Sequence, residues 1–184
     1  MDKKSLIRKK YIIKRKKNYF QIKKNFFNPL IKILKEKVKN KKLSISLYYP
    51  TSFELNILTI LDIEFFRKFK LLLPVVEENN SMNFYKWKKN DLLYINKYGI
   101  PEPVKSEIII PSIILVPILA FNENKHRLGY GGGFYDRYLN KYIKMHKNIL
   151  TVGVAFSFQK HHKLPINKKD VKLNYILTEK GIIK

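Results

Sequence analysis

Hydrophobic residues recur along this chain in two different periods, and the two kinds of stretch alternate. Where apolar residues return every three or four positions, the pattern predicts an amphipathic helix. Such stretches cover residues 3–18, 29–40, 51–69 and 134–142. Pro29 suits the first turn of the second helix. Thr51 or Ser52 is the expected cap of the third helix, with Glu54 in its first turn, where the helix dipole favours an acid.

Shorter runs that alternate or are apolar throughout predict strands. They cover residues 42–50, 71–76, 82–87, 112–121, 149–156 and 172–177. The Gly and two Pro residues of KYGIPEP, residues 97–103, predict a loop of fixed shape instead. Strands that alternate with helices indicate an α/β fold with a layered, largely parallel sheet.

The composition narrows the class of protein. With 184 residues and 45% hydrophobic residues, one packed core is expected rather than a disordered chain. The absence of cysteine excludes a disulfide scaffold, a cysteine zinc site and a cysteine nucleophile. The longest uncharged run, residues 108–122, is too short and too interrupted by proline to span a bilayer, and the Lys-rich start lacks a secretory signal. We therefore expect a cytoplasmic protein with no membrane contact.

A net charge of +24 favours nucleic-acid binding at first sight. Only five of the 38 basic residues are Arg, however, whereas readers of phosphate and bases favour the bidentate guanidinium. Lys, Asn, Ile, Tyr and Phe are abundant together, which is typical of a nucleotide-biased genome. The charge is concentrated in residues 1–42, which carry +15. We interpret the excess mainly as compositional, although it would still steer anionic ligands.

The most specific stretch is RLGYGGGFYDR, residues 127–137, which holds four of the seven glycines between an apolar strand and a helix. A Gly-rich loop that opens a helix exposes backbone N–H groups and the positive end of the helix dipole, and so binds phosphate. No Gly-Lys-Ser/Thr follows, and Phe134 occupies the last glycine position of a dinucleotide-binding motif, so neither common phosphate loop fits. Asp136, in the first helical turn, can hold the Mg²⁺ of a nucleoside triphosphate.

This stretch resembles the RLGxGxGYYDR signature of the 5-formyltetrahydrofolate cyclo-ligases, also called 5,10-methenyltetrahydrofolate synthetases. Other segments follow in the family's order, namely Lys4 with Arg8, Glu54, LLLP at 71–74, GIPEP at 99–103, VGVAF at 152–156 and LPINKKDVKLNYILTE at 164–179. Six positions depart from the family pattern: Lys125 replaces Gly, Asn122, Ser112 and Asn174 replace Asp, Phe134 replaces Tyr, and Ile57 replaces Thr.

The resemblance implies one cyclo-ligase domain over residues 1–184, with the basic helices of 1–42 packed on it. The implied fold is a three-layer α/β/α arrangement with a largely parallel, mixed sheet, NagB/RpiA/CoA-transferase-like. The implied reaction is the ATP- and Mg²⁺-dependent cyclisation of 5-formyltetrahydrofolate to 5,10-methenyltetrahydrofolate, which releases ADP and phosphate after phosphorylation of the formyl oxygen. ATP and the folate would be the partners of a monomer without a specific nucleic acid.

The resemblance also implies roles for individual residues. The ATP site would comprise Lys4, Arg8, Arg127, Leu128, Gly129, Tyr130, Gly131, Gly132, Gly133, Phe134 and Tyr135. The folate site would comprise Tyr49, Glu54, Tyr98, Tyr130 and Phe134, and the Mg²⁺ ligands would be Asp136 and Asp170. Without the family, Lys4, Arg8 and Asp170 would be interpreted as solvated charges. A basic nucleic-acid-binding protein, or a sugar-phosphate isomerase or transferase on a related fold, remain the alternatives.

Overall fold

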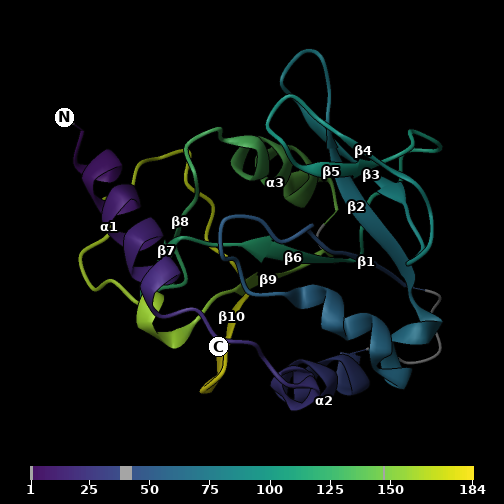
Figure 1. Ribbon diagram of the computed structural model, residues 1–184, viewed down its shortest axis with the longest axis horizontal. Coiled ribbons are helices and arrows are strands. Elements are labelled where there is room, and N and C mark those ends of the chain that lie inside the picture. The colour runs from purple at the N-terminus through teal and green to yellow at the C-terminus, as the bar shows by residue number, and fades with distance from the viewer. Residues whose placement is uncertain (1, 38–42, 147) are drawn as a thin grey trace.

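A seven-stranded mixed sheet forms the centre of the computed structural model, which describes residues 2–37, 43–146 and 148–184 (Figure 1). The strand order is β11-β10-β9-β6-β1-β2-β3. The strands are β1 (Ser44–Ser46), β2 (Lys70–Val76), β3 (Met82–Lys86), β6 (Ile113–Pro117), β9 (Leu150–Val154), β10 (Tyr175–Thr178) and β11 (Gly181–Ile183). The five inner strands pair in parallel, whereas β3 and β11 close the edges antiparallel. The predicted, largely parallel sheet is confirmed.

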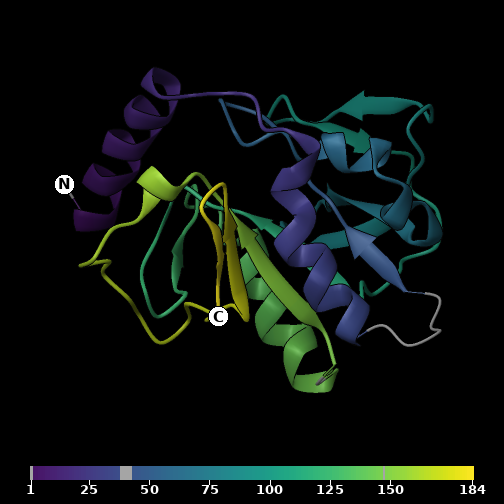
Figure 2. The same cartoon turned by 90° about the horizontal axis from the view of Figure 1, so that it is seen from below.

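Helices cover both faces of this sheet. The elements are α1 (Lys3–Lys17), α2 (Asn28–Lys37), α3 (Phe134–Met145) and the 3₁₀ helices η1 (Lys24–Phe27), η2 (Ile57–Asp62), η3 (Glu64–Lys68) and η4 (Ser157–Gln159). In Figure 2, α2 lies in front of the sheet and α3 behind it. Alternation along β6 matches these layers: Ile113 and Leu115 belong to the core under α2, and Ile114 and Val116 to the core under α3.

Helix α1 lies apart from these layers, beside a hairpin of β7 (Ala120–Phe121) and β8 (Arg127–Leu128) (Figure 1). Ile7 and Tyr11 of α1 are buried in a small cluster with Ala120 and Leu128 of the hairpin and with Leu164. The remaining faces of α1 carry mostly Lys and Arg, among which Leu6, Ile12 and Ile13 are exposed. The predicted first helix is therefore confirmed, and its burial ties it to the segment that leads into the Gly-rich loop.

The stretch from 51 to 69 is not an α-helix, contrary to expectation. Ser52 and Phe53 have φ values of +48° and +62°, which no α-helix accommodates. Ile63, with φ −105° and ψ 118°, separates η2 from η3. The apolar spacing reflects burial of short 3₁₀ turns under the sheet, and Glu54 lies in a tight turn rather than in a first helical turn.

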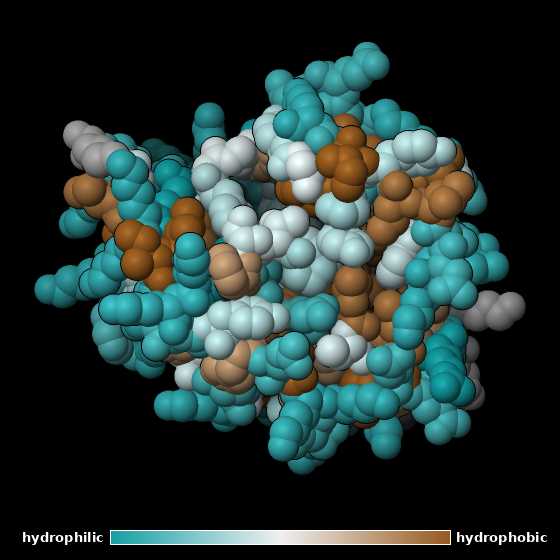
Figure 3. Space-filling model, viewed as in Figure 1, coloured by the Kyte–Doolittle hydropathy of each residue, from teal (hydrophilic) through white to brown (hydrophobic). Residues whose placement is uncertain are grey.

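The predicted loop 97–103 is also partly wrong, because β5 (Pro101–Pro103) pairs antiparallel with β4 (Leu93–Ile95). Only Asn96 to Gly99 form the turn, and Gly99 takes φ +73° there. Tyr94 and Ile95 are exposed on this hairpin. The face of the molecule seen in Figure 3 is largely hydrophilic, with brown, hydrophobic side chains gathered at its upper right.

Other helices and strands begin or end a few residues away from their predicted bounds. The strand expected over 42–50 is limited to Ser44–Ser46, and Lys42 lies outside the described residues. The apolar run 112–121 divides after Pro117 into β6 and β7. Helix α2 begins at Asn28, and its expected end at Asn40 lies outside the described residues. In the described part of the chain, none of the helices has the length and apolar character that a bilayer crossing requires.

Candidate active site

The Gly-rich loop, residues 129–133, connects β8 to the N-terminus of α3. Gly133 caps the helix with φ +69°, and Gly131 takes φ +110°, so both positions need glycine. The first helical hydrogen bond runs from Arg137 N–H to Gly133 O, at 3.0 Å. The three preceding amides of α3 therefore have no partner within the helix, and an anion could accept from them.

Helix α1 presents two cations to this loop. The Arg8 Nε donates to the Gly129 carbonyl at 2.9 Å, and a Cβ built on Gly131 would lie 3.4 Å from the Arg8 guanidinium carbon. One turn earlier, the Lys4 ammonium lies 2.6 Å from Asp170. The structure thus brings Arg8 to the loop and Lys4, on the same face of α1, to Asp170, although each pair is more than 120 residues apart in sequence.

Arg127 and Asp136 form an ion pair that joins the two ends of the loop. Arg127 donates to the Asp136 Oδ1 at 2.7 Å and to the Val171 carbonyl at 3.1 Å. Burial lowers the pKa of Arg127, and the Asp136 carboxylate partly offsets this effect. The Val171 N–H also donates to Asp136, so the segment that carries Asp170 lies against the start of α3.

Asp136 and Asp170 are the two carboxylates that the sequence predicts as Mg²⁺ ligands. Each is held by a cation, Arg127 or Lys4 respectively, and each accepts a backbone N–H. Within residues 2–37, 43–146 and 148–184, no group of three or more His, Asp or Glu could hold a metal ion by itself. Two carboxylates suit Mg²⁺ that takes its other ligands from phosphate and water.

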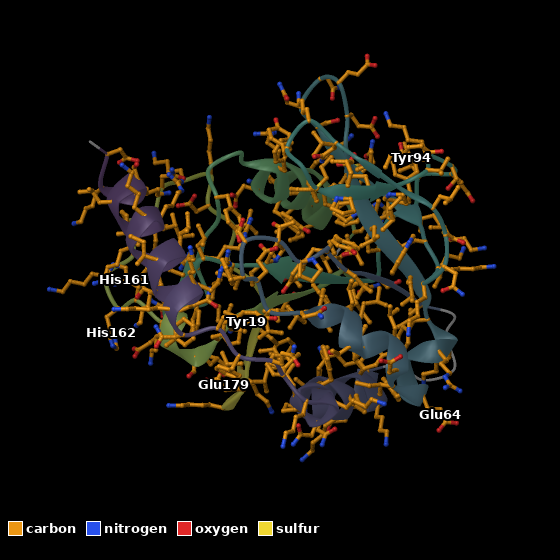
Figure 4. All side chains as sticks on the ribbon, in the orientation of Figure 1. Tyr19, Glu64, Tyr94, His161, His162 and Glu179 are labelled. Carbon is orange, nitrogen blue, oxygen red and sulfur yellow. The ribbon has the colours of Figure 1, made fainter. Side chains whose placement is uncertain are left out.

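Two of the four histidines, His161 and His162, follow η4 in the chain. His161 and His162 lie side by side near α1 (Figure 4). The His161 ring packs on Tyr11, with centroids 5.8 Å apart, and His162 is 3.5 Å from Glu123.

Glu54 is buried in the turn that follows β1, with only 6% of its surface exposed. Its Oε2 accepts the Thr51 N–H at 2.8 Å, and its Oε1 accepts the Tyr130 hydroxyl at 2.6 Å. Burial raises the pKa of Glu54, whereas its hydrogen bonds and the nearby Arg15 lower it. A residue of the Gly-rich loop therefore touches the carboxylate that the sequence predicts as the pterin ligand.

Aromatic residues border the same loop. Tyr98, at the tip of the β4–β5 hairpin, is 51% exposed and packs edge-on against Phe134 with centroids 5.8 Å apart. The Arg137 guanidinium lies over the Phe134 ring, and its other contact is the Asn80 carbonyl at 2.7 Å. The hairpin tips at Asn80 and Tyr98 thus meet the beginning of α3.

The other predicted residues differ in how they face the loop. Tyr49 is half-buried after β1, and the Tyr135 hydroxyl is buried with no partner among the described residues. The Leu128 side chain packs under α1, so only its backbone faces the loop. A Cβ on Gly132 would lie 2.6 Å from the Phe134 ring.

Sequence reasoning missed Arg15. This residue is 1% exposed, and its guanidinium donates to the Tyr130 hydroxyl at 2.5 Å and to the Ser52 carbonyl at 2.6 Å. Arg15 is seven residues after Arg8, about two helical turns, which places both on one face of α1. That spacing was the available signal, but a helix rich in Lys and Arg obscured it.

Comparisons with known proteins identify the family of this chain. The model of the 5-formyltetrahydrofolate cyclo-ligase family matches residues 1–179. A probable 5-formyltetrahydrofolate cyclo-ligase of Schizosaccharomyces pombe is 29% identical over 140 residues, which cover 68% of this chain and 69% of that protein.

Solved structures give the same result. The NMR structure of Aquifex aeolicus 5,10-methenyltetrahydrofolate synthetase superposes with a TM-score of 0.75 at 32% identity, and covers 98% of this chain and 92% of that one. A Mycoplasma pneumoniae 5,10-methenyltetrahydrofolate synthetase superposes with a TM-score of 0.69 over 96% of this chain and 98% of that one; at 22% identity it supports the fold alone. Because the family model matches residues 1–179 of its 184 residues, this chain belongs to the 5-formyltetrahydrofolate cyclo-ligase family.

Proposed function

We propose that this chain catalyses the ATP-dependent cyclisation of 5-formyltetrahydrofolate to 5,10-methenyltetrahydrofolate, with release of ADP and phosphate. Membership of an ATP-dependent family supports the reaction. The observation that carries the proposal to this site is the 2.6 Å hydrogen bond between Tyr130 and Glu54. It joins a loop suited to phosphate to a buried carboxylate suited to the N–H donors of a pterin.

The chemistry explains why both halves are needed. A formamide carbon is a poor electrophile, because the amide nitrogen donates electrons into the carbonyl. Transfer of the γ-phosphoryl group from ATP to the formyl oxygen releases ADP and converts that oxygen into a leaving group. N10 then forms the new bond to the formyl carbon, the C–O bond breaks, phosphate leaves and N10 loses its proton. The enzyme's contribution is positioning and charge stabilisation, without a side-chain nucleophile.

The proposed phosphate half consists of α1, the Gly-rich loop and Arg127. Lys4 contacts Asp170 and Arg8 contacts the Gly129 carbonyl, and both cations would bind phosphate oxygens of ATP. Arg127, which is fixed by Asp136, would neutralise charge that develops during phosphoryl transfer. The loop backbone from Leu128 to Tyr135 would supply N–H donors.

Asp136 and Asp170 would hold Mg²⁺ together with the polyphosphate, which fits a donor set of two carboxylates near a phosphate site. When bound, Mg²⁺ would neutralise the β- and γ-phosphate oxygens. On the protein side, Arg127 and Lys4 would orient the two carboxylates through their ion pairs.

The proposed folate half consists of Glu54 and the aromatic residues. Glu54 Oε1 accepts the Tyr130 hydroxyl, and Oε2 accepts the Thr51 N–H at 2.8 Å and the Thr51 hydroxyl at 3.4 Å, so the carboxylate keeps lone-pair capacity for pterin N–H donors. Tyr98 and Phe134, in edge-on contact, would flank the flat heterocycle, and Tyr49 and Tyr130 would complete this side. The monomeric state and the cytoplasmic compartment stay predictions.

A spectrophotometric assay tests the proposal. The purified protein should form methenyltetrahydrofolate from 5-formyltetrahydrofolate only when both ATP and Mg²⁺ are present, and one ADP should appear for each product molecule. EDTA should abolish product formation, and added Mg²⁺ should restore it. Product formation that does not depend on nucleotide would exclude this mechanism and would favour the isomerase or transferase alternative.

A further inference from the structure

Arg15 is the most deeply buried cation of α1, yet nothing in the phosphate half requires it. It is 1% exposed, and its guanidinium donates two hydrogen bonds, one to the Ser52 carbonyl and one to the Tyr130 hydroxyl. The guanidinium carbon lies 5.4 Å from the centre of the Tyr130 ring. A buried charge is costly unless its partners are well placed, so this arrangement needs an explanation.

The direction of the hydrogen bonds supplies one. A guanidinium can only donate, so the Tyr130 hydroxyl accepts from Arg15 and must donate its single proton elsewhere. That proton goes to the Glu54 Oε1 at 2.6 Å. Because Arg15 donates to the Tyr130 hydroxyl, it orients the hydroxyl proton toward Glu54. These two hydrogen bonds connect α1, the Gly-rich loop and the turn after β1.

The second bond of Arg15 acts on the same turn. The Ser52 carbonyl accepts from Arg15, and Ser52 and Phe53 both take positive φ values that cost free energy for non-glycine residues. The turn closes through the Glu54 N–H to the Thr51 carbonyl at 2.8 Å. Arg15 thus helps to keep the strained backbone that aims the Glu54 carboxylate.

We propose that Arg15 is a positioning residue for folate recognition, which holds Glu54 in place through Tyr130 and through the Ser52 carbonyl. The inference rests on the proposed role of Glu54 as the pterin ligand. Arg15 itself would touch neither the folate nor ATP, because Tyr130 covers it and it is nearly inaccessible. Its effect should therefore appear in folate binding, whereas ATP binding through Lys4 and Arg8 should change little.

The electrostatic surroundings of Glu54 provide an independent readout. The groups that face it are Arg15 from α1, Tyr130 from the loop, Tyr48 from the end of β1 and Tyr135 from α3. Arg15 is the cation among them, and it lowers the pKa of Glu54 against the effect of burial. Loss of this charge should therefore move the acidic limb of kcat/KM for the folate to higher pH.

The experiment compares Arg15→Gln with Lys9→Gln, which removes one charge from an exposed position of the same helix. In Arg15→Gln, the KM for 5-formyltetrahydrofolate should rise by about 10-fold or more, as expected for hydrogen bonds to a charged group, and the KM for ATP by less than about 3-fold. The acidic limb should move to higher pH in Arg15→Gln and stay in place in Lys9→Gln. Arg15→Lys should keep the limb near its original pH, because it retains the charge.

A double-mutant cycle with Tyr130→Phe tests whether Arg15 acts through Tyr130. The folate KM of the double variant should be little higher than that of the more impaired single variant, because both changes break the same chain of contacts. Additive losses, an unchanged folate KM, or equal rises for both ligands would overturn the inference. If Arg15→Gln does not fold, the cycle is run with Arg15→Met, which removes the charge and the donors but keeps a long unbranched side chain, and the same outcomes decide it.

Glu54→Gln separates the two hypotheses. If it raises the folate KM and Arg15→Gln does not, only the inference about Arg15 is wrong. If Glu54→Gln leaves the folate KM unchanged, both the folate role of Glu54 and the inference are wrong.

Discussion

Arg127 and Asp136 make an asymmetric ion pair: the Arg127 side chain is 3% exposed and the Asp136 side chain 32%. If Asp136 is lost, the buried Arg127 guanidinium keeps its hydrogen bond to the Val171 carbonyl but has no carboxylate beside it, whereas loss of Arg127 leaves a carboxylate that water can reach. Removing one partner of a buried pair costs most when the remaining charge is the buried one. The two ends of the pair should therefore differ in their effect on stability.

We predict that Asp136→Ala lowers the free energy of unfolding more than Arg127→Ala does, by about 1–3 kcal/mol. Both variants should lose about 100-fold or more in kcat/KM, because each removes charge stabilisation in phosphoryl transfer. Urea unfolding and the methenyltetrahydrofolate assay measure the two effects separately. Near-normal rates in both variants would show that the phosphate site lies elsewhere.

Glu54 should make substrate binding depend on pH on the acidic side. Burial raises its pKa above the ordinary value, and only the ionised form accepts two donors from a pterin. The kcat/KM for 5-formyltetrahydrofolate should therefore be constant above this raised pKa and fall as the pH drops through it. Glu54→Gln should raise the folate KM far more than the ATP KM and should remove this acidic limb. An acidic limb that survives in Glu54→Gln would assign it to another group.

Parallel strands and α3 could be predicted because their apolar patterns agree with their local geometry. The stretch from 51 to 69 could not, because burial of successive 3₁₀ turns produces spacing close to that of a helix, and the positive φ values of Ser52 and Phe53 have no signature in residue type. The pairing of β4 with β5 was missed because two prolines indicated a loop, yet the edge position of β5 in this hairpin tolerates proline.

The candidate site also has one part that the sequence predicts and one part that it does not. The Gly-rich loop was visible because glycine is required by conformation, and Gly131 and Gly133 do take positive φ. Arg15 was not visible, because α1 also carries Lys9, Lys10 and Lys14, and a single sequence does not say which cation is buried. Tertiary contacts with Tyr130 and Ser52 make that distinction.

Gly131→Ala tests whether the shape of the loop serves ATP. At φ +110° an alanine is strained by about 1–3 kcal/mol, and its Cβ would lie in van der Waals contact with the Arg8 guanidinium, 3.4 Å from its carbon. We expect a lower melting temperature and a higher KM for ATP. Gly181→Ala is the matched control, since Gly181 has φ +119° with no atom within 4 Å of the added Cβ and lies in the β10–β11 hairpin. It should lose similar stability with an unchanged ATP KM; equal ATP effects in both variants would contradict the assignment.

The cyclo-ligase and nucleic-acid-binding hypotheses differ most in the role they assign to the basic surface. If the Lys excess is compositional, duplex DNA should bind weakly and without sequence preference, and binding should collapse between about 50 and 200 mM salt as counterion release predicts. Folate turnover should persist over this range. At low salt the positive field should still speed the capture of ATP, so added salt should lower kcat/KM more than kcat.

A variant with five exposed lysines changed to Gln tests both claims. The positions are Lys9, Lys10, Lys17, Lys23 and Lys24. Lys14 is kept, because it donates to the Phe158 carbonyl at 2.8 Å and so supports the packing of α1. The variant should lose most DNA binding and much of the salt dependence of kcat/KM, and it should keep kcat, since these lysines contact none of the reacting groups. Tight, sequence-selective DNA binding by the parent at 200 mM salt, or loss of kcat in the variant, would return the basic N-terminal region to the function.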